Sequence, residues 1–346
     1  MIALTPARLL KSSLWLSLIL LGAALIGLVV GHSEIDLFKA MSVPGSVEYT
    51  ILVEHRLPRV ILAALVGAGL ASSGAAFQAL MRNPLADPFI LGASGGAALG
   101  GTLAMSMGLG ALTVAGVILP IVPIATFLGS LAALVLVYAL ASKSGRFSAV
   151  DVLLIGVVFN FFASAVVMFL KTMVTAEKAQ ELLFWLMGTL DVERVDDFQL
   201  WTSLGLVAVG FAYLMRHAHA LNVLTLGEEA AGHLGIPIER VRRGVFIATS
   251  IMVGAAVSVS GLIGFVGLIV PHAVRLKMGA DHRLLLPASA MTGATFLILC
   301  DALSRLLFPV FTSETPVGVI TAFIGGPVFV YLMRKSSQSE GMRLNA

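Results

Sequence analysis

The stretch that decides the fold runs from Arg56 to Gly101 and reads RLPRVILAALVGAGLASSGAAFQALMRNPLADPFILGASGGAALGG. It begins with two arginines, continues as an apolar run rich in glycine and alanine, and breaks at a polar elbow, Arg82–Pro88, that contains two prolines. A hydrophobic run that served only as an anchor would need neither the charges nor the prolines. Charged and proline-broken backbone beside membrane spans is costly, and it usually marks a place where something is bound or moved.

The composition of the whole chain indicates a membrane protein. Of its 346 residues, 58% are hydrophobic and only 12% are charged, whereas soluble domains contain about 25% charged residues. Apolar runs close to the length that crosses a bilayer, roughly 20 residues, recur along the sequence. The one cysteine, Cys300, lies in such a run, so neither a disulfide framework nor a cysteine metal site is expected. The net charge of +3 comes from cations in short loops and does not indicate nucleic acid as a partner.

The fold class predicted from these runs is an all-α polytopic membrane protein with about ten transmembrane helices. The expected spans are 14–31, 57–81, 89–106, 112–140, 150–170, 200–215, 243–260, 264–274, 284–306 and 316–333. The eighth is shorter than the others and is interrupted by glycine. The first follows Arg8 and Lys11 as a signal peptide would, but its apolar run exceeds the usual length of roughly 7–15 residues. No clear cleavage site follows it, so we expect a retained span.

The distribution of Lys and Arg predicts on which side of the membrane each loop lies. With the N-terminus inside and ten alternating spans, 15 of the 22 cations lie inside and seven lie outside. Cytoplasmic loops are enriched in Lys and Arg, so both termini are predicted to be cytoplasmic. Seven cations oppose this trend, namely Lys39, Arg56, Arg59, Lys171, Lys178, Arg194 and Arg305.

The ionisable residues of the predicted spans lie near the ends of the spans. Asp301 and Arg305 are four residues apart near the outer end of the ninth span, where they form either an intrahelical ion pair or a contact with an extracellular partner. Asp151 begins the fifth span, where a carboxylate complements the helix dipole. Ion-coupled carriers usually need an ionisable group near the midplane, and the sequence offers no convincing one, which weakens that hypothesis.

Glycine is abundant, with 35 in the chain, and several glycines follow helical spacing. Gly92, Gly96 and Gly100 repeat every four residues. Small residues at this spacing let helix backbones approach one another in lipid. We therefore expect a compact bundle of many helices with broken elements, which suits a translocator better than a receptor.

The most distinctive polar segment is the loop at about 217–242. Its middle reads TLGEEAAGHLGIP from Thr225 to Pro237. Thr225 and Glu228 have the spacing of a capping box, which predicts that a helix begins there. Gly235 and Pro237 predict the end of this helix and the start of a second one. We interpret the loop as a cytoplasmic docking surface, and the alternative is an interfacial helix that lies on the bilayer.

Several of these motifs resemble one known family. The sequence EAAGHLG at 229–235 resembles the Glu-Ala-Ala-x-x-x-Gly coupling motif of ABC importer permeases. The segments that resemble the iron-chelate and cobalamin permeases are Arg56–Arg59, Gln78, Arg82–Gly96, Gly261–His272, Leu286–Pro287, Asp301–Arg305 and Glu314–Thr321. The likeness runs from about residue 50 to residue 334, in the same order and without a large insertion.

The resemblance implies a single transmembrane permease domain over 1–346 with the type II ABC importer permease fold. It implies a homodimer, two cytosolic ABC ATPase subunits and a periplasmic or extracellular substrate-binding protein, all at the inner (plasma) membrane of a bacterium, where lipid surrounds the spans. The chain has no Gly-x-x-x-x-Gly-Lys-Ser/Thr phosphate loop, so it is not expected to bind ATP or to be an enzyme. The expected cargo is an iron chelate: ferric siderophore first, then haem, with cobalamin third. The alternative function is ion-coupled secondary transport of a small hydrophilic solute.

The resemblance also carries over individual positions at both faces of the membrane. Three arginines match positions that meet carboxylates on the binding protein: Arg56, Arg59 and Arg305. Four residues match the coupling helices that sit in a cleft of the ATPase: Glu228, Glu229, Gly232 and Gly235. Docking through exposed charges of this kind sets mainly orientation and association rate, and it depends strongly on salt.

Two further sets concern the path through the membrane. Asn83 and Leu85 match a cytoplasmic constriction, and the alternative is an ordinary turn between helices. The fifth span resembles the pore-lining span of the family, although it has no strict motif; its candidate pathway residues are Phe159, Asn160 and Phe162. Three histidines, His217, His219 and His272, do not have metal-ligand spacing, so we expect no metal, no cofactor and no catalytic residue.

Overall fold

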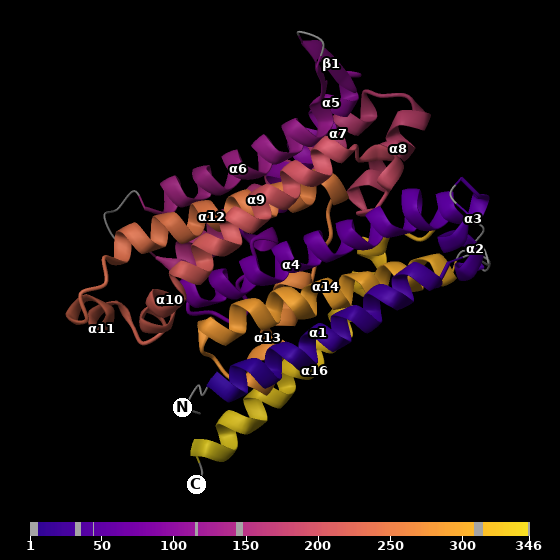
Figure 1. Cartoon of the computed structure of the whole chain (residues 1–346). Coiled ribbons are helices and arrows are strands. Elements are labelled where there is room, and N and C mark those ends of the chain that lie inside the picture. The colour runs from indigo at the N-terminus through magenta and orange to yellow at the C-terminus, as the bar shows by residue number, and fades with distance from the viewer. Residues whose placement is uncertain are drawn as a thin grey trace.

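The computed structural model describes residues 6–31, 36–43, 45–114, 117–142, 148–307 and 314–344. Figure 1 shows an elongated bundle in which most helices run along one common direction. Nine helices of the described chain are long and apolar enough to cross a membrane, by length and composition. The prediction of an all-α polytopic membrane protein is therefore confirmed.

The long helices agree closely with nine of the predicted spans. In chain order they are α1 (Pro6–Val29), α4 (Leu57–Leu80), η2 with α5 (Phe89–Ala93 and Ser94–Ser106), α6 (Ile121–Ala141), α7 (Ala149–Thr172), α9 (Asp197–Arg216), α12 (Ile238–Ser260), α14 (His282–Leu306) and α16 (Val317–Leu344). Shorter elements between them are α2 (Leu37–Ser42), α3 (Val47–Tyr49), η1 (Thr50–Arg56), α8 (Ala176–Leu186), η3 (Val192–Arg194), α10 (Ala218–Leu224), α11 (Glu228–His233) and α13 (Val266–Met278). Because α3 and η1 continue directly into α4, this helix extends well beyond the predicted start of its span.

The eighth predicted span is a half-helix. α13 has 13 residues, and at about 1.5 Å per residue it is too short to cross a bilayer alone. Gly261–Phe265 precede it without helical structure, and the backbone of Phe265 is left-handed, with φ of 70°. Five extended residues reach at most about 17 Å, so this segment and α13 together are long enough for one crossing. The described residues thus contain nine helices that are long enough to cross a membrane, and the tenth predicted crossing, at Gly261–Met278, stays a prediction.

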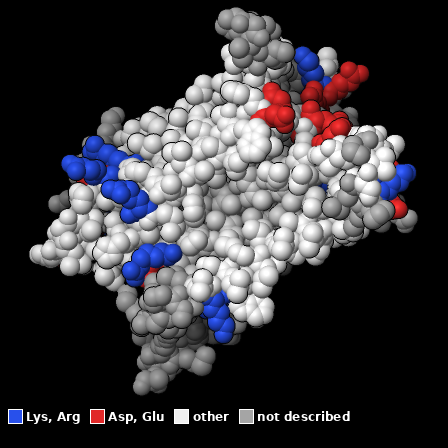
Figure 2. Space-filling model, in the orientation of Figure 1, with Lys and Arg blue, Asp and Glu red and all other residues white. Residues whose placement is uncertain are grey.

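The two ends of the bundle carry opposite charge. Figure 2 shows mainly Lys and Arg at the end that holds α10 and α11, and a cluster of Asp and Glu with fewer Lys and Arg beside it at the opposite end near α8. The start of α1 and the end of α16 lie at the same end as α10 and α11 (Figure 1). By the positive-inside rule this end is cytoplasmic, which agrees with the predicted orientation. Two of the cations used for that prediction, Lys143 and Arg146, lie outside the described residues.

The fourth predicted span begins later than expected. β1 (Ala111–Val114) and β2 (Val117–Pro120) pair as an antiparallel hairpin, with Ala111 opposite Pro120. The helix α6 begins only at Ile121, so the prediction of helix from residue 112 was wrong for residues 112–114 and 117–120, and residues 115–116 lie outside the described part of the chain. Hydropathy does not distinguish a short apolar strand from a helix, and this segment is rich in β-branched residues, which favour strands.

An outer helix that the sequence analysis did not predict lies between the fifth and sixth spans. α8 begins after Thr175, whose hydroxyl accepts the N–H of Lys178. Trp185 in its last turn is buried, and its ring lies so close to Gly101 of α5 that a side chain there would overlap it. α8 is only 11 residues long and carries charges, so a search for membrane spans does not find it.

Glycines hold the bundle together at close crossings of backbone. A Cβ built on Gly67 of α4 would overlap the carbonyl oxygen of Gly293 in α14, and the reverse substitution would overlap Gly67. Gly96 of α5 and Gly129 of α6 oppose each other in the same way. The predicted role of small residues in helix packing is confirmed at these crossings.

Candidate functional site

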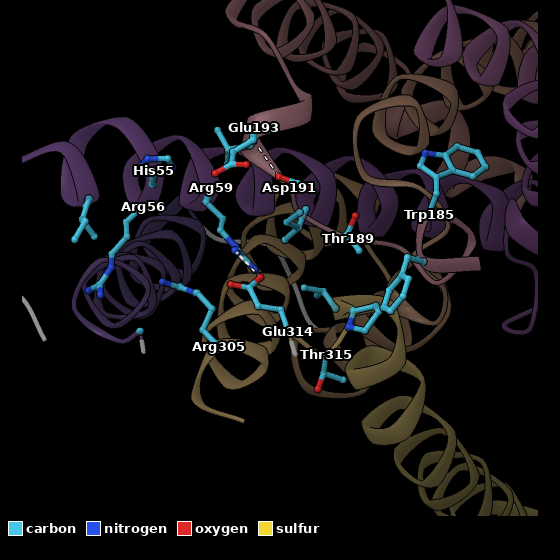
Figure 3. A pocket seen from close by; sticks show the side chains of 17 residues that line it. His55, Arg56, Arg59, Trp185, Thr189, Asp191, Glu193, Arg305, Glu314 and Thr315 are labelled. Atoms are coloured by element: carbon cyan, nitrogen blue, oxygen red, sulfur yellow. Dashed lines mark hydrogen bonds and ion pairs between the residues drawn. The ribbon is translucent and has the colours of Figure 1, made fainter. Parts of the chain in front are cut away.

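A pocket of about 530 Å³ opens at the outer end of the bundle. It lies between η1, the start of α4, the end of α8, the end of α14 and the residues before α16 (Figure 3). Its labelled lining residues are His55, Arg56, Arg59, Trp185, Thr189, Asp191, Glu193, Arg305, Glu314 and Thr315. The structure thus brings together the three arginines that the sequence analysis assigned to docking.

Arg59 is the centre of an ion-pair network in this pocket. Its Nε donates to Oδ1 of Asp301 at 2.8 Å, and its Nη1 donates to Oε2 of Glu314 at 3.0 Å. The side chain of Asp301 is buried, whereas that of Glu314 is 40% exposed. One side of the Arg59 guanidinium is therefore fixed inside the protein, and the other is paired with a carboxylate that water reaches.

Arg305 points into the protein. It forms the predicted i,i+4 ion pair with Asp301 at 3.0 Å, and both side chains are buried. Its two terminal nitrogens also donate to carbonyl oxygens at the outer end of α1, to Gly27 at 2.8 Å and to Val30, the residue after the helix, at 2.7 Å. The alternatives of an ion pair and an outward-facing arginine are thus resolved in favour of the ion pair in this structure.

Together, Arg56 and Arg305 cap the outer end of α1. The last carbonyls of a helix have no partner within the helix. Nη1 of Arg56 donates to the carbonyls of Leu28 at 2.9 Å and Val29 at 2.6 Å. Arg305 donates to the carbonyls of the residues before and after this pair, Gly27 and Val30. The positive charges also complement the negative end of the helix dipole. This structural role was missed because the sequence does not show which helix ends meet.

The elbow leaves α4 through a helix-terminating turn at the cytoplasmic end. The N–H of Asn83 donates to the carbonyl of Gln78, and the N–H of Arg82 donates to that of Ala79. Arg82 has φ of 47°, a left-handed conformation that normally favours glycine. Oδ1 of Asn83 then accepts the N–H of Leu85 at 2.9 Å. Asn83 is half-buried and Leu85 is exposed, so the two predicted constriction residues lie at the surface of the elbow, and their role stays a prediction.

Asn160 of α7 holds the broken start of the third span. Its Nδ2 donates to the carbonyls of Phe89 at 2.9 Å and Ile90 at 3.0 Å, and its Oδ1 accepts the N–H of Gly95 at 3.0 Å. These backbone groups flank Gly92, where φ of 104° interrupts the helix. An amide in an apolar span needs hydrogen-bond partners, so the asparagine within this run was the signal that could have indicated such a contact.

The phenylalanines of α7 face two directions. Phe159 lies against the kink, 3.3 Å from the position of a Cβ built on Gly92. Phe162 is 61% exposed and its neighbour Phe161 is 74% exposed. Of the three predicted pathway residues, Phe159 and Asn160 therefore contact the third span, and only Phe162 lies on an open face of the described chain.

The cytoplasmic loop begins its helix later than predicted. Thr225 ends α10, and its hydroxyl donates to the carbonyl of Asn222 at 2.7 Å. α11 starts at Glu228 after Gly227, whose φ is 119° and whose position has no side chain to cap the helix. The predicted capping box of Thr225 and Glu228 is therefore wrong, because the turn at Gly227 directs Thr225 back toward α10.

The predicted end of this helix is confirmed. The N–H of Ile236 donates to the carbonyl of Ala231, and the N–H of Gly235 donates to that of Gly232. With φ of 75° at Gly235, these two bonds form a Schellman motif. Such a turn gives the loop a defined shape although most of it is exposed.

One of the four coupling candidates in the loop forms an ion pair with the membrane domain, and the other three are exposed at the surface. Glu228 forms an ion pair with the buried Arg242 of α12 at 2.6 Å, which fixes α11 to the membrane domain. Glu229, Gly232 and Gly235 are exposed, and the exposed leucines Leu226 and Leu234 lie beside them. In the described part of the chain, no group of three or more His, Cys, Asp or Glu residues could hold a metal ion.

The sequence matches the FecCD transport family over residues 18–335. It is 45% identical over 279 residues to the cobalamin import system permease protein BtuC of Halobacterium salinarum, a match that covers 81% of this chain and 72% of that protein. It is 39% identical over 294 residues to the hemin transport system permease protein HmuU of Yersinia pestis, with 84% and 85% covered.

The fold gives the same result. A solved structure described as a metal-chelate type ABC transporter in an inward-facing conformation matches with a TM-score of 0.81 and 33% sequence identity, and the match covers 94% of this chain and 99% of the other. Sequence and fold agree over nearly the whole length, including the outer pocket and the cytoplasmic loop. The chain is a multi-pass membrane permease and belongs to the FecCD transport family.

Proposed function

We propose that this chain is the subunit through which an ABC importer moves a metal chelate into the cell, with separate ATPase subunits as the source of energy. The observation that carries the proposal is the α10–α11 loop, which offers an exposed, well-shaped docking surface at the cytoplasmic end of a permease fold. Because the sequence has no phosphate-binding loop, the permease itself has no ATPase site in this proposal.

The proposed cargo is a bulky metal chelate. Relatives of this chain are named for cobalamin and for hemin, and a solved neighbour is described as metal-chelate type. These names favour cobalamin and haem more than the sequence alone did, and ferric siderophore remains the third member of the group. Uptake of one labelled chelate in competition with the other two would identify the cargo.

The proposed assembly contains two copies of the chain. The open face of α7, which exposes Phe161 and Phe162, supports a path between two copies rather than through one. An apolar wall without ionisable ligands suits a cargo that is selected elsewhere. In this proposal the selection takes place in a substrate-binding protein that docks at the outer pocket.

Arg59 is the docking arginine that the geometry favours, because Arg56 and Arg305 are held by α1. Replacing Arg59 with glutamine removes the charge and leaves Asp301 paired with Arg305. We expect the binding protein to bind about tenfold more weakly at low salt, with a smaller difference at high salt. Glu314→Gln frees the other side of Arg59 and is expected to strengthen binding. Surface plasmon resonance on the purified permease measures both effects.

The control for this experiment is Lys171→Gln, which removes another outer cation that is half-buried and does not line the pocket. It should leave binding unchanged. If Arg59→Gln and Lys171→Gln bind the partner equally well, docking does not use the pocket.

The coupling loop gives the second prediction for this function. Glu229→Gln changes an exposed residue that is not tied to α12, and we expect the ATPase activity stimulated by cargo to fall about fivefold or more, since docking energy is concentrated in a few residues. Insertion and thermal stability of the permease should not change. The measurement is ATP hydrolysis by the importer reconstituted in liposomes. Glu177→Gln makes the same substitution on the outer helix α8, and activity reduced equally in both variants would contradict the assignment.

A further inference from the structure

Asp87 is a buried carboxylate of the elbow that no role described above uses. It is only 3% exposed, and its Oδ1 accepts the N–H of Phe89 at 2.8 Å, which closes a turn at the start of η2. Burial raises the pKa of Asp87 to about 6, and the hydrogen bond from Phe89 opposes this rise. This pKa lies below 7, so the anionic form of Asp87 predominates at neutral pH. A buried anion is costly unless its surroundings compensate the charge.

The carboxylate of Asp87 lies against the first turn of α13. A Cβ built on Gly267 would lie 3.3 Å from Oδ2 and 3.5 Å from Oδ1 of Asp87. Gly267 is the second residue of α13, where the N–H groups have no carbonyl partner within the helix and the helix dipole is positive. The ionisable residues of α13, His272, Arg275 and Lys277, follow in later turns. No charged side chain of the described residues contributes to the pKa shift of Asp87.

The same turn of α13 is anchored to α4. Gly74 crosses the backbone of Gly267 so closely that a Cβ on Gly74 would overlap the carbonyl oxygen. Nε2 of Gln78 donates to the carbonyl of Leu268 at 3.1 Å. Neither Gly74 nor Gln78 is ionisable, so α4 supplies position but no charge. The elbow, α4 and the half-helix therefore meet at one junction, and Asp87 is the carboxylate that the elbow contributes to it.

We propose that Asp87 is a positioning residue of the inner mouth, whose carboxylate ties the elbow to the first turn of α13. The elbow carries Asn83 and Leu85, so a displacement of α13 moves the predicted constriction with it. The tie depends on charge, because a protonated or amide side chain no longer attracts the positive helix end. The link to gating rests on the proposed function, in which the elbow closes the cytoplasmic side of the path.

The test of the tie itself uses the full chain in membrane vesicles and needs no partner. Ala86 is fully buried in the elbow, so an Ala86→Cys variant reports whether the elbow opens; the native Cys300 is also buried and adds little background. Asp87→Asn retains an oxygen for the N–H of Phe89 and places an amide NH₂ where the second oxygen met α13. We expect the thiol at position 86 to react about threefold to tenfold faster in Asp87→Asn than with native Asp87.

The control is Asp151→Asn, which neutralises an exposed carboxylate in the first turn of α7 at the same face of the membrane. It should leave the labelling rate unchanged. A second comparison is made at pH 5, where native Asp87 is protonated, and there the rates with Asp87 and Asp87→Asn should converge. Equal rates at pH 7, or a difference that persists at pH 5, would overturn the proposal.

A functional readout separates this inference from the proposed function. In the reconstituted importer, Asp87→Asn is expected to lower the amount of cargo taken up per ATP hydrolysed by about half or more, and Asp151→Asn is not. An unchanged ratio would show that the tie has no part in coupling. If the wild-type chain failed to take up cargo with ATP, the proposed function would be wrong, and the labelling result would still decide whether Asp87 holds the elbow.

Discussion

Gly74→Ala is expected to separate α4 from α13 and to destabilise the permease by about 3 kcal/mol or more, at the upper end of the range for overpacked cores. A Cβ on Gly74 would lie 2.7 Å from the Cα of Gly267 and would overlap its carbonyl oxygen. Both obstacles are backbone atoms, so no change of side-chain rotamer relieves the overlap. Thermal unfolding of the purified protein, followed by size-exclusion chromatography, measures the loss.

The control is Gly205→Ala in α9, where the added Cβ has no described heavy atom within 4 Å apart from the backbone of its own helix. Alanine favours a helix over glycine by about 1 kcal/mol in water, so this variant should be neutral or slightly more stable. If the two variants had equal thermal unfolding midpoints, the crossing of α4 and α13 would tolerate a side chain, which would contradict the close backbone contact at Gly74.

Arg305→Met is expected to cost about 3–5 kcal/mol, the range for removing one partner of a buried ion pair. The change removes the cation that pairs with Asp301. It also leaves the carbonyls of Gly27 and Val30, at the end of α1, without their hydrogen-bond donor. Arg305→Lys retains the charge but not the planar fork that reaches all three groups, so it should restore only part of the stability. Unfolding in a titration with denaturing detergent gives the comparison.

Arg283→Met is the matched control, because the exposed Arg283 pairs with Asp281 at the cytoplasmic surface. A surface pair of this kind contributes about 0–1 kcal/mol. If Arg283→Met and Arg305→Met were equally stable, Arg305 would not be the cap of α1. Limited proteolysis of the outer end of α1 should also proceed faster in Arg305→Met alone.

The caps of α1 change how the outer arginines are understood. Family resemblance grouped Arg56, Arg59 and Arg305 by a single role, but the guanidinium groups of Arg56 and Arg305 are bonded to the carbonyls of α1. Replacing either of them would weaken the fold before it tested docking. Arg59 differs because its partner Glu314 is partly exposed, so only Arg59 offers a test in which docking and folding are separable.

The positions of the membrane spans could be predicted because apolar runs of sufficient length have few alternatives in lipid. The exceptions have specific causes. The strands Ala111–Val114 and Val117–Pro120 are short and apolar, and hydropathy does not distinguish short apolar strands from part of a helix. The predicted span at 264–274 lies across a non-helical segment and a half-helix, a division that depends on packing against α4 and α16 as well as on local sequence.

The candidate sites show the same division between local and tertiary information. The end of α11 at Gly235 follows from local chemistry and was predicted correctly. The predicted start of that helix was wrong. Thr225 could cap the start of α11 or bond back to the end of α10, and with the positive φ at Gly227 it bonds back to α10. Asn160 was assigned to the pathway, yet its partners are backbone groups about 70 residues away in sequence, and a single sequence does not reveal such pairs.

The most direct test of the central claim is uptake of a labelled metal chelate into liposomes that contain the permease, its ATPase and the substrate-binding protein. We expect the chelate to accumulate only when ATP and the ATPase subunit are both present, and to be unaffected when ion gradients are collapsed. Accumulation without ATP, or with the ATPase subunit omitted, would contradict the account and would indicate an ion-coupled carrier.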